Sequence, residues 1–224
     1  MSITANRLRQ LARPGLVFHV WGNLPIDNWI IDAEMVWQRR ICHELGVPFV
    51  IDPWGCHDGL IVQSLQDGGL YVGESLASKG SVMTPLESYC AKINNCTRKV
   101  RLFEIIGITT SQELDISREW QIKVKGRPYN YLAFADLAYK SFCADWSEIV
   151  PTNWYERIMK RIGDHAAGIH WADWCTEGVR DACEILKPDI DIFQYSNPTP
   201  LTTEHVAGLL PRKLEMKTTL SELT

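Results

Sequence analysis

The sequence contains no block of basic residues and no long apolar segment. Its formal net charge is −4, and both signs are spread along the chain, which is not the charge pattern of a nucleic-acid-binding tail. No apolar run reaches the roughly 18 residues that a membrane-spanning helix needs, and residues 1–13 lack the apolar core of a signal peptide. We therefore expect a cytoplasmic protein that has no membrane-spanning segment and does not bind nucleic acid.

Cysteine motifs of the kind that bind zinc are also missing. The cysteines are odd in number and form no Cys-x-x-Cys pair, so without an export signal we expect free thiols in a reducing compartment. No pair has the usual spacing of zinc ligands, and the scattered glycines form no phosphate-binding loop. The sequence thus predicts no metal and no cofactor. The seven cysteines are Cys42, Cys56, Cys90, Cys96, Cys143, Cys175 and Cys183.

The composition that remains is that of a globular domain. The chain has 224 residues, of which 46% are hydrophobic and 22% are charged, close to the average for folded proteins. It shows no internal repeat, low-complexity segment or clear linker, so we expect one domain over residues 1–224. Nine tryptophans are many for this length, and several could line a groove or an interface.

Patterning along the chain predicts a mixture of strands and helices. Apolar runs bounded by turn residues predict strands at 16–21, 57–62, 70–75 and 98–106, with Asp67-Gly68-Gly69 as a hairpin turn. Helical periodicity and capping residues predict helices at 28–45, 109–125, 132–142, 153–162 and 175–186. Thr84 and Pro85 are expected to open a further short helix, with Thr84 as its cap.

Cys175 is the first residue with the chemistry of a nucleophile. It stands where a loop becomes a helix, and the positive end of a helix dipole, with a nearby imidazolium, can lower a thiol pKa from about 8.5 into the range of about 3.5–7.5. Free backbone N–H groups at the same helix end could stabilise an oxyanion. The alternative is that Cys175 is a buried core residue, as most free cysteines are.

A thiol nucleophile needs an imidazole partner, and His57 is the best placed of six histidines. It begins the first strand of the predicted hairpin, whereas His19 lies inside an apolar strand. Cys56 is a poor nucleophile for His57, because neighbouring strand residues point to opposite faces. The other histidines are His43 late in a helix, His165 and His170 in the loop before Cys175, and His205 near the C-terminus.

A third polar group should hold the imidazole in its productive tautomer. Glu74 lies near the end of the returning strand of the hairpin, so pairing can bring it beside His57; Ser75 is the neighbouring alternative. Other carboxylate pairs, at 32 and 34 and at 189 and 191, have the spacing of solvated surface charges.

The order of these segments resembles the circularly permuted NlpC-type papain-like hydrolases, in which the histidine strand precedes the cysteine helix. HDGLIV at 57–62 and LYVGES at 70–75 resemble the family's His-x-Gly and Val-x-Glu strands. GRPYNY at 126–131 resembles its Gly-x-Pro-Tyr loop, and WCTEGV at 174–179 its aromatic-Cys-Ser-Glu-Leu-Val motif. RPGLVFH at 13–19 and NPTPLTTEH at 197–205 resemble the opening strand and the closing segment. The likeness covers roughly residues 13–210.

The resemblance implies an α+β, papain-like fold, with an antiparallel sheet packed on the cysteine-bearing helix and additional helices. It implies a Cys175–His57–Glu74 site that hydrolyses a small-molecule or peptide amide through a thioacyl intermediate. Tyr129 and Trp174, which belong to the matching motifs, are the candidate substrate-binding residues. Two departures stand out: Gly178 replaces a bulky aliphatic residue, and residues 22–53 are longer than the family's connection and form a candidate helical insertion.

Two other functions fit the same pattern. One is an acyltransferase or thioesterase acting on lipid-like esters, because the lecithin:retinol acyltransferase relatives share the permuted order and the thiol chemistry. The other is a structural or binding module without catalysis, for instance in a phage particle. The sequence indicates neither the substrate nor the oligomeric state.

Overall fold

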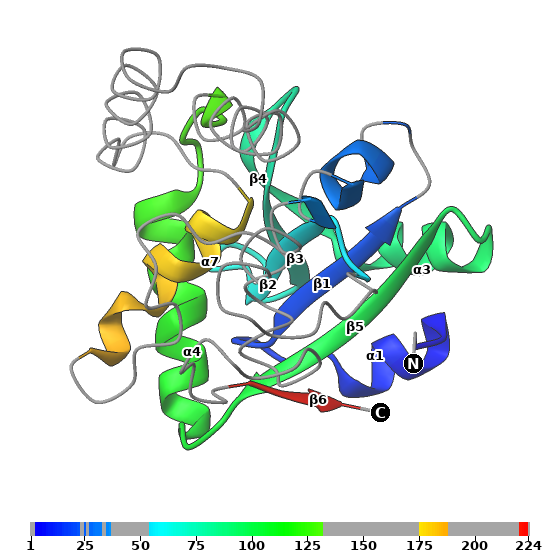
Figure 1. The fold of residues 1–224 in the computed structure, drawn as a ribbon. Coiled ribbons are helices and arrows are strands. Elements are labelled where there is room, and N and C mark those ends of the chain that lie inside the picture. The colour runs from blue at the N-terminus through cyan, green and yellow to red at the C-terminus, as the bar shows by residue number, and fades with distance from the viewer. Residues whose placement is uncertain are drawn as a thin grey trace, which may run out of the picture.

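The fold is α+β and is built on one antiparallel sheet. The computed structural model describes residues 3–22, 25, 27–32, 35–36, 54–131, 175–187 and 220–223. Within these residues six strands pair in the order β4-β3-β2-β1-β5-β6 (Figure 1). The strands are β1 (Val17–Gly22), β2 (His57–Gln63), β3 (Leu70–Leu76), β4 (Gly80–Pro85), β5 (Arg98–Ile105) and β6 (Leu220–Leu223).

The predicted strands at 16–21, 57–62, 70–75 and 98–106 are confirmed as β1, β2, β3 and β5. The predicted hairpin joins β2 to β3, and Gly68 in its turn adopts φ +71°, a conformation that costs glycine little. The register places Gly59 opposite Glu74 and Leu60 opposite Gly73. This register brings the carboxylate of Glu74 to the end of the hairpin where His57 begins β2.

The prediction that Thr84 caps a helix is wrong. Thr84 lies in β4, opposite Val72 of β3, and the helix α3 (Leu86–Asn94) begins only after Pro85, without a side-chain cap. The β3–β4 connection turns at Gly80, where φ is +69° and an added Cβ would lie 2.4 Å from the backbone oxygen of Arg127. Strand pairing to β3 therefore overrides the local helix-start signal. The sequence prediction also lacked β6 and the helix α1 (Ala5–Leu11).

The helix predicted at 109–125 is present as two segments. Thr109 and Gln112 form a capping box at the start of α4 (Thr110–Glu119), which continues as the π-helix η1 (Trp120–Val124). The helix predicted at 175–186 is α7 (Cys175–Cys183) with the 3₁₀ turn η2 (Glu184–Leu186). Of the helix predicted at 28–45, residues 28–32, 35 and 36 are helical. Its other residues and the helices predicted at 132–142 and 153–162 lie outside the described residues.

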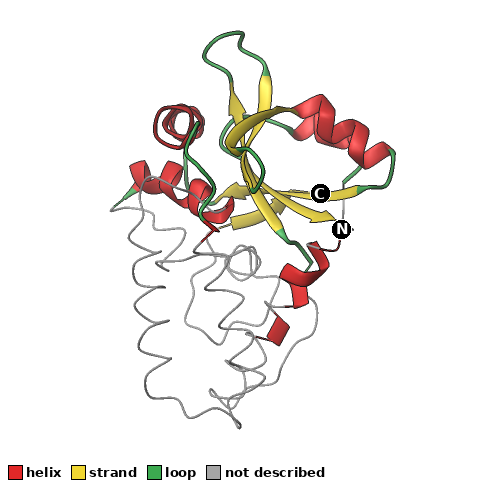
Figure 2. Cartoon of the chain, turned by 90° about the horizontal axis from the view of Figure 1, so that it is seen from above, coloured by secondary structure: helices red, strands yellow, loops and turns green. Residues whose placement is uncertain are grey.

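The sheet is covered on both faces (Figure 2). Strand residues alternate between the faces, so Leu60 and Val62 pack with Trp120 and Val179 of η1 and α7, whereas Ile61 of the same strand packs with the helices α1 and α3. The same alternation places Asp58 on the α7 side, where Thr176 donates to it. His57, the first residue of β2, lies at the end of the strand, where it contacts Glu74 of β3.

In the part of the chain that is described, no helix has the length and apolarity to cross a membrane. That one domain covers residues 1–224, with 22–53 as an insertion, stays a prediction.

Candidate active site

Cys175 and His57 meet where the cysteine-bearing helix crosses the sheet. Cys175 is the first residue of α7 and His57 the first residue of β2, and α7 packs on β2. Their side chains lie close enough for the hydrogen bond and charge of Cys175 to raise the pKa of His57. The two residues that the sequence pairs across 118 positions (57 to 175) are therefore near one another, and that they act as a catalytic pair stays a prediction.

Glu74 holds the other side of the His57 ring. Its Oε2 lies 2.8 Å from His57 Nε2, which leaves Nδ1 for the hydrogen bond with Cys175. Ser75, the alternative partner, is turned away: its Oγ lies 2.8 Å from Ser81 Oγ. The geometry thus places Glu74, and not Ser75, beside the imidazole.

Two further donors fix the carboxylate of Glu74. The Tyr89 hydroxyl donates to Oε2 at 2.5 Å, and the Thr84 hydroxyl donates to Oε1. Glu74 is almost fully buried, which by itself raises the pKa of its carboxyl, but the hydrogen bonds from His57, Thr84 and Tyr89 and the charge of His57 lower that pKa overall. An ionised carboxylate can only accept hydrogen bonds, so Nε2 of His57 carries a proton.

His57 is thereby held as a cation. Burial lowers the pKa of the imidazole, but the hydrogen bonds to Cys175 and Glu74 and the negative charges of both groups outweigh burial and raise the pKa of His57 to about 10. At neutral pH the ring therefore carries protons on both nitrogens. An imidazolium beside the sulfur favours the thiolate, which is the nucleophilic form of a cysteine.

The neighbouring imidazole distinguishes Cys175 from two other buried thiols. Its side chain sits beside His57, which retains 19% of its side-chain exposure. Burial raises the pKa of Cys183 to about 12 and raises the pKa of Cys56 further. Neither thiol is ionised near neutral pH. Cys56 instead points its Sγ toward the backbone oxygen of Val20, at 3.6 Å.

Tyr129 lies on a loop that is fixed to two elements, near enough to Cys175 for the charge of that group to affect its pKa. Burial, followed by the charge of Cys175 and then those of Tyr131 and Glu177, raises the pKa of Tyr129, so its hydroxyl stays protonated. The loop's backbone pairs with β4, where Ser81 N donates to Arg127 O at 2.8 Å.

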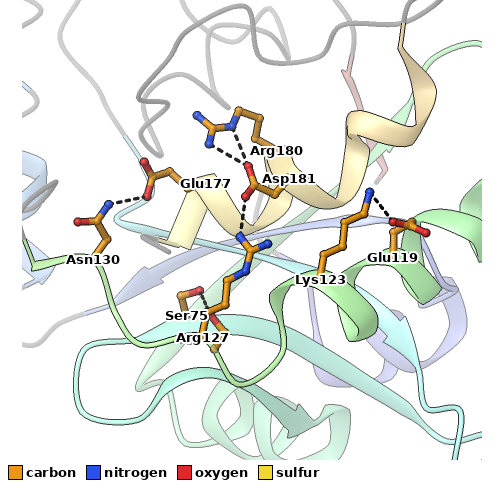
Figure 3. A network of polar contacts seen from close by, with 9 residues as sticks. Ser75, Glu119, Lys123, Arg127, Asn130, Glu177, Arg180 and Asp181 are labelled. Atoms are coloured by element: carbon orange, nitrogen blue, oxygen red, sulfur yellow. Dashed lines mark hydrogen bonds and ion pairs between the residues drawn. The ribbon is translucent and has the colours of Figure 1, made fainter. Parts of the chain in front are cut away.

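Side chains of the same loop hold it to α7 (Figure 3). Arg127 Nη1 lies 2.8 Å from Asp181 Oδ2, Arg180 contacts Oδ1 of the same carboxylate, and Asn130 donates to Glu177 at 3.2 Å. A tyrosine held in this way beside the sulfur can contact a bound substrate. Trp174, the other predicted substrate-binding residue, lies outside the described residues.

Gly178, which departs from the family pattern, stands at a close approach of α7 to the sheet and η1. An added Cβ would lie 3.1 Å from Val124 Cγ1 and 3.4 Å from Ser75 Oγ. These distances leave no space for a large aliphatic side chain. The absence of a side chain therefore lets the helix that carries Cys175 pack tightly against β3 and η1.

Sequence reasoning missed the groups that support the predicted site. Tyr89 and Thr84 bind Glu74, and their sequence positions carried no signal of this role. Asp58 and His19 form a fully buried pair on the neighbouring strands β2 and β1. The sequence could have indicated this pair, because each residue is a polar residue within a largely apolar strand. His43, His165, His170 and His205 lie outside the described residues, as do Glu34, Asp189 and Asp191.

Comparison with protein-family models and with curated proteins finds no match. Among solved structures, one similar chain is described as the metalloprotein yiiX from Escherichia coli O157:H7, DUF1105. It is 11% identical, with a TM-score of 0.45 over 95% of this chain and 96% of that chain. In the described portion of the present chain, no group of three or more His, Cys, Asp or Glu side chains could hold a metal ion.

Proposed function

We propose that the chain is a papain-like cysteine hydrolase that cleaves amides, as an amidase or peptidase, and that its fold is the permuted NlpC-type form of that class. The observation that carries the proposal is the hydrogen bond between the His57 ring and the Glu74 carboxylate, with Cys175 near enough to raise the pKa of the same ring. Nucleophile, base and orienting acceptor in hydrogen-bond contact are the arrangement that thiol-dependent acyl transfer needs.

The reaction follows from the protons that these groups hold. The thiol proton resides on His57, and the Cys175 thiolate attacks the carbonyl carbon of the amide. The tetrahedral intermediate collapses as the C–N bond breaks, and His57 gives its Nδ1 proton to the leaving amine. Water then attacks the thioester while His57 accepts one of its protons, and the acid is released as the thiolate re-forms.

The first turn of α7 supplies groups for the developing negative charge. Backbone N–H groups at the start of a helix have no partner within the helix, and the helix dipole places positive charge there. Cys175 is the first residue of α7, so an oxyanion formed at its sulfur lies beside these donors. Removing one such donor costs acyl-transfer enzymes about 10²–10³ in rate.

Replacement of the nucleophile is the direct test. On a panel of amides and esters, C175A should lower turnover by about a thousandfold or more, whereas C183A, which removes a buried thiol from the same helix, should keep wild-type kcat on the folded protein. Equal turnover by C175A and the wild type would overturn the proposal. The mass of a trapped thioacyl adduct on Cys175 would separate short polar acyl groups from the long apolar groups of a lipid acyltransferase.

A labelling experiment tests the site without a substrate. Cys96 is exposed, so it serves as an internal standard for the reactivity of an ordinary thiol. Iodoacetamide at pH 6 should modify Cys175 faster than Cys96, because a neighbouring imidazolium favours the thiolate form of a cysteine. Slow, equal labelling of both thiols would instead favour a binding module.

A further inference from the structure

A second polar cluster reaches Cys175 from within the sheet–α7 interface. Thr176 follows Cys175 in α7, and its hydroxyl donates to Asp58 Oδ2 at 2.6 Å. Asp58 Oδ1 lies 2.6 Å from Nδ1 of His19 on the neighbouring strand β1, because the register sets His19 opposite Asp58. All three residues have 0% exposure. We call Thr176, Asp58 and His19 the inner relay.

The His19 ring is held in one position by the residues packed around it. An added Cβ on Gly55 would lie 1.9 Å from His19 Nε2, so the ring fits only because residue 55 has no side chain. Phe103 packs edge-on to the ring with centroids 5.9 Å apart, and Trp54 packs across it at 5.7 Å. The inner relay is therefore held in place by its surroundings, and Asp58 cannot turn its carboxylate away from Thr176 without losing His19.

The direction of these hydrogen bonds decides what Thr176 offers to the sulfur. A hydroxyl has a single hydrogen, and Thr176 gives it to Asp58. Cys175 Sγ lies 3.8 Å from Thr176 Oγ1, so the sulfur faces only the lone pairs of that oxygen. A protonated thiol can donate to them. A thiolate has no proton to donate. Its negative charge is repelled by these lone pairs and by the Asp58 carboxylate that Thr176 binds.

We propose that the inner relay stabilises the protonated form of the Cys175 thiol, and so opposes the stabilisation of the thiolate by His57. Thr176 touches the reacting sulfur, whereas Asp58 and His19 are positioning residues that orient its hydroxyl. The inference deepens the proposed function, since it takes Cys175 as the nucleophile. A thiolate that is harder to form is also a stronger nucleophile. The relay therefore lowers the fraction of Cys175 that is ionised and raises the reactivity of the thiolate that does form.

Other charged or titratable groups near Cys175 also affect the protonation of its thiol. His57 approaches from β2, Tyr129 from the loop at 126–131, and Cys56 from the residue before β2. Glu177 lies on α7 itself and is bonded to Asn130. The contacts described for these groups do not include the Thr176 hydroxyl, so a substitution at Thr176 acts first on the inner relay.

The test is the pH dependence of Cys175 alkylation by iodoacetamide, followed by peptide mass spectrometry on the full chain. We expect T176V to move the midpoint to lower pH by about 0.4 to 1 unit, the effect of losing one hydrogen bond to the protonated thiol. T176S keeps the hydroxyl and should retain the wild-type midpoint. If T176V does not fold, T176A removes the same hydroxyl and is measured in its place.

Two results would overturn the inference. An unchanged midpoint would mean that Thr176 does not stabilise the protonated thiol, and a midpoint moved to higher pH would mean that its hydroxyl donates to the thiolate. H57Q in the same assay should move the midpoint upward. Because no substrate is used, a protein that hydrolyses no amide but shows the T176V shift would refute the hydrolase and leave the relay standing.

Discussion

Two histidine–carboxylate pairs lie on neighbouring strands and differ in which face of the sheet they serve. His57 and Glu74 turn toward α3, where Tyr89 and Thr84 complete the shell of the carboxylate. His19 and Asp58 turn toward α7 and are sealed, with both side chains at 0% exposure, whereas the His57 side chain keeps 19%. The same two functional groups thus lie in one case near the Cys175 sulfur, with a partly exposed imidazole, and in the other inside the packed interface.

The contrast shows that contact with the sulfur, and not the presence of a histidine–carboxylate pair, marks the candidate base. His57 lies near Cys175, which raises the pKa of its imidazole, while His19 is connected to Thr176, the neighbour of Cys175, through Asp58. Substitutions at the two histidines should accordingly change different properties of the protein.

The largest expected difference is between H57A and H19A. H57A should lower kcat/KM for an amide by about 10²–10⁴, the usual contribution of a general base. H19A should lower the free energy of unfolding by about 3–5 kcal/mol, because it removes the histidine partner of the buried Asp58 carboxylate. Steady-state kinetics and urea denaturation of both variants measure these effects. If H19A lost turnover while remaining stable, and H57A kept its turnover, the roles of the two histidines would be reversed.

A smaller effect is expected from E74Q on the pH dependence. The pKa of His57 is raised to about 10, so the imidazolium and the stability it contributes are present at neutral pH and are lost as pH rises through about 10. A carboxylate beside a histidine accounts for about 1–3 units of such a shift, so E74Q should move the alkaline limb of kcat/KM to lower pH by that amount. E87Q, which removes an exposed carboxylate of α3 bound to Arg9, should leave the limb in place.

The smallest effect tests the shell around Glu74. Y89F removes one of three donors to the carboxylate, and we expect a loss of about 0.5–1.5 kcal/mol in stability with a modest fall of the alkaline limb's midpoint. Y71F removes the exposed hydroxyl bonded to Asp67 and is the matched control, because the same atom is deleted far from the site. A Y89F protein with the stability and pH profile of Y71F would show that the Tyr89 contact has no role in holding Glu74.

Local sequence signals were sufficient where a segment's own pattern decided its structure. The apolar strand beginning at His57, the turn at Gly68 and the capping box at Thr109 were all predicted and are all present. The local signal failed at Thr84, where pairing of β4 with β3 outweighs the helix-start pattern. β6 was missed as well, since its four residues form a strand only by pairing with β5.

The candidate site divides in the same way. Motif order pointed to Cys175, His57 and Glu74 but left Ser75 as an alternative to Glu74. The structure decides between them, because Glu74 and Ser75 lie on opposite faces of the sheet and only Glu74 bonds the imidazole. Tyr89, Thr84 and Thr176 could not be predicted as supporting residues, because each acquires its partner from an element distant in sequence.

The amino-acid sequence by itself determined the alternation of its strands, the turn between β2 and β3 and the start of the cysteine-bearing helix. These features depend on side-chain periodicity and backbone preference within a few residues. Only the tertiary structure decided that the sulfur of Cys175 lies between His57 and Thr176. That placement depends on how α7 packs across β2, and helix packing joins residues that no local pattern relates.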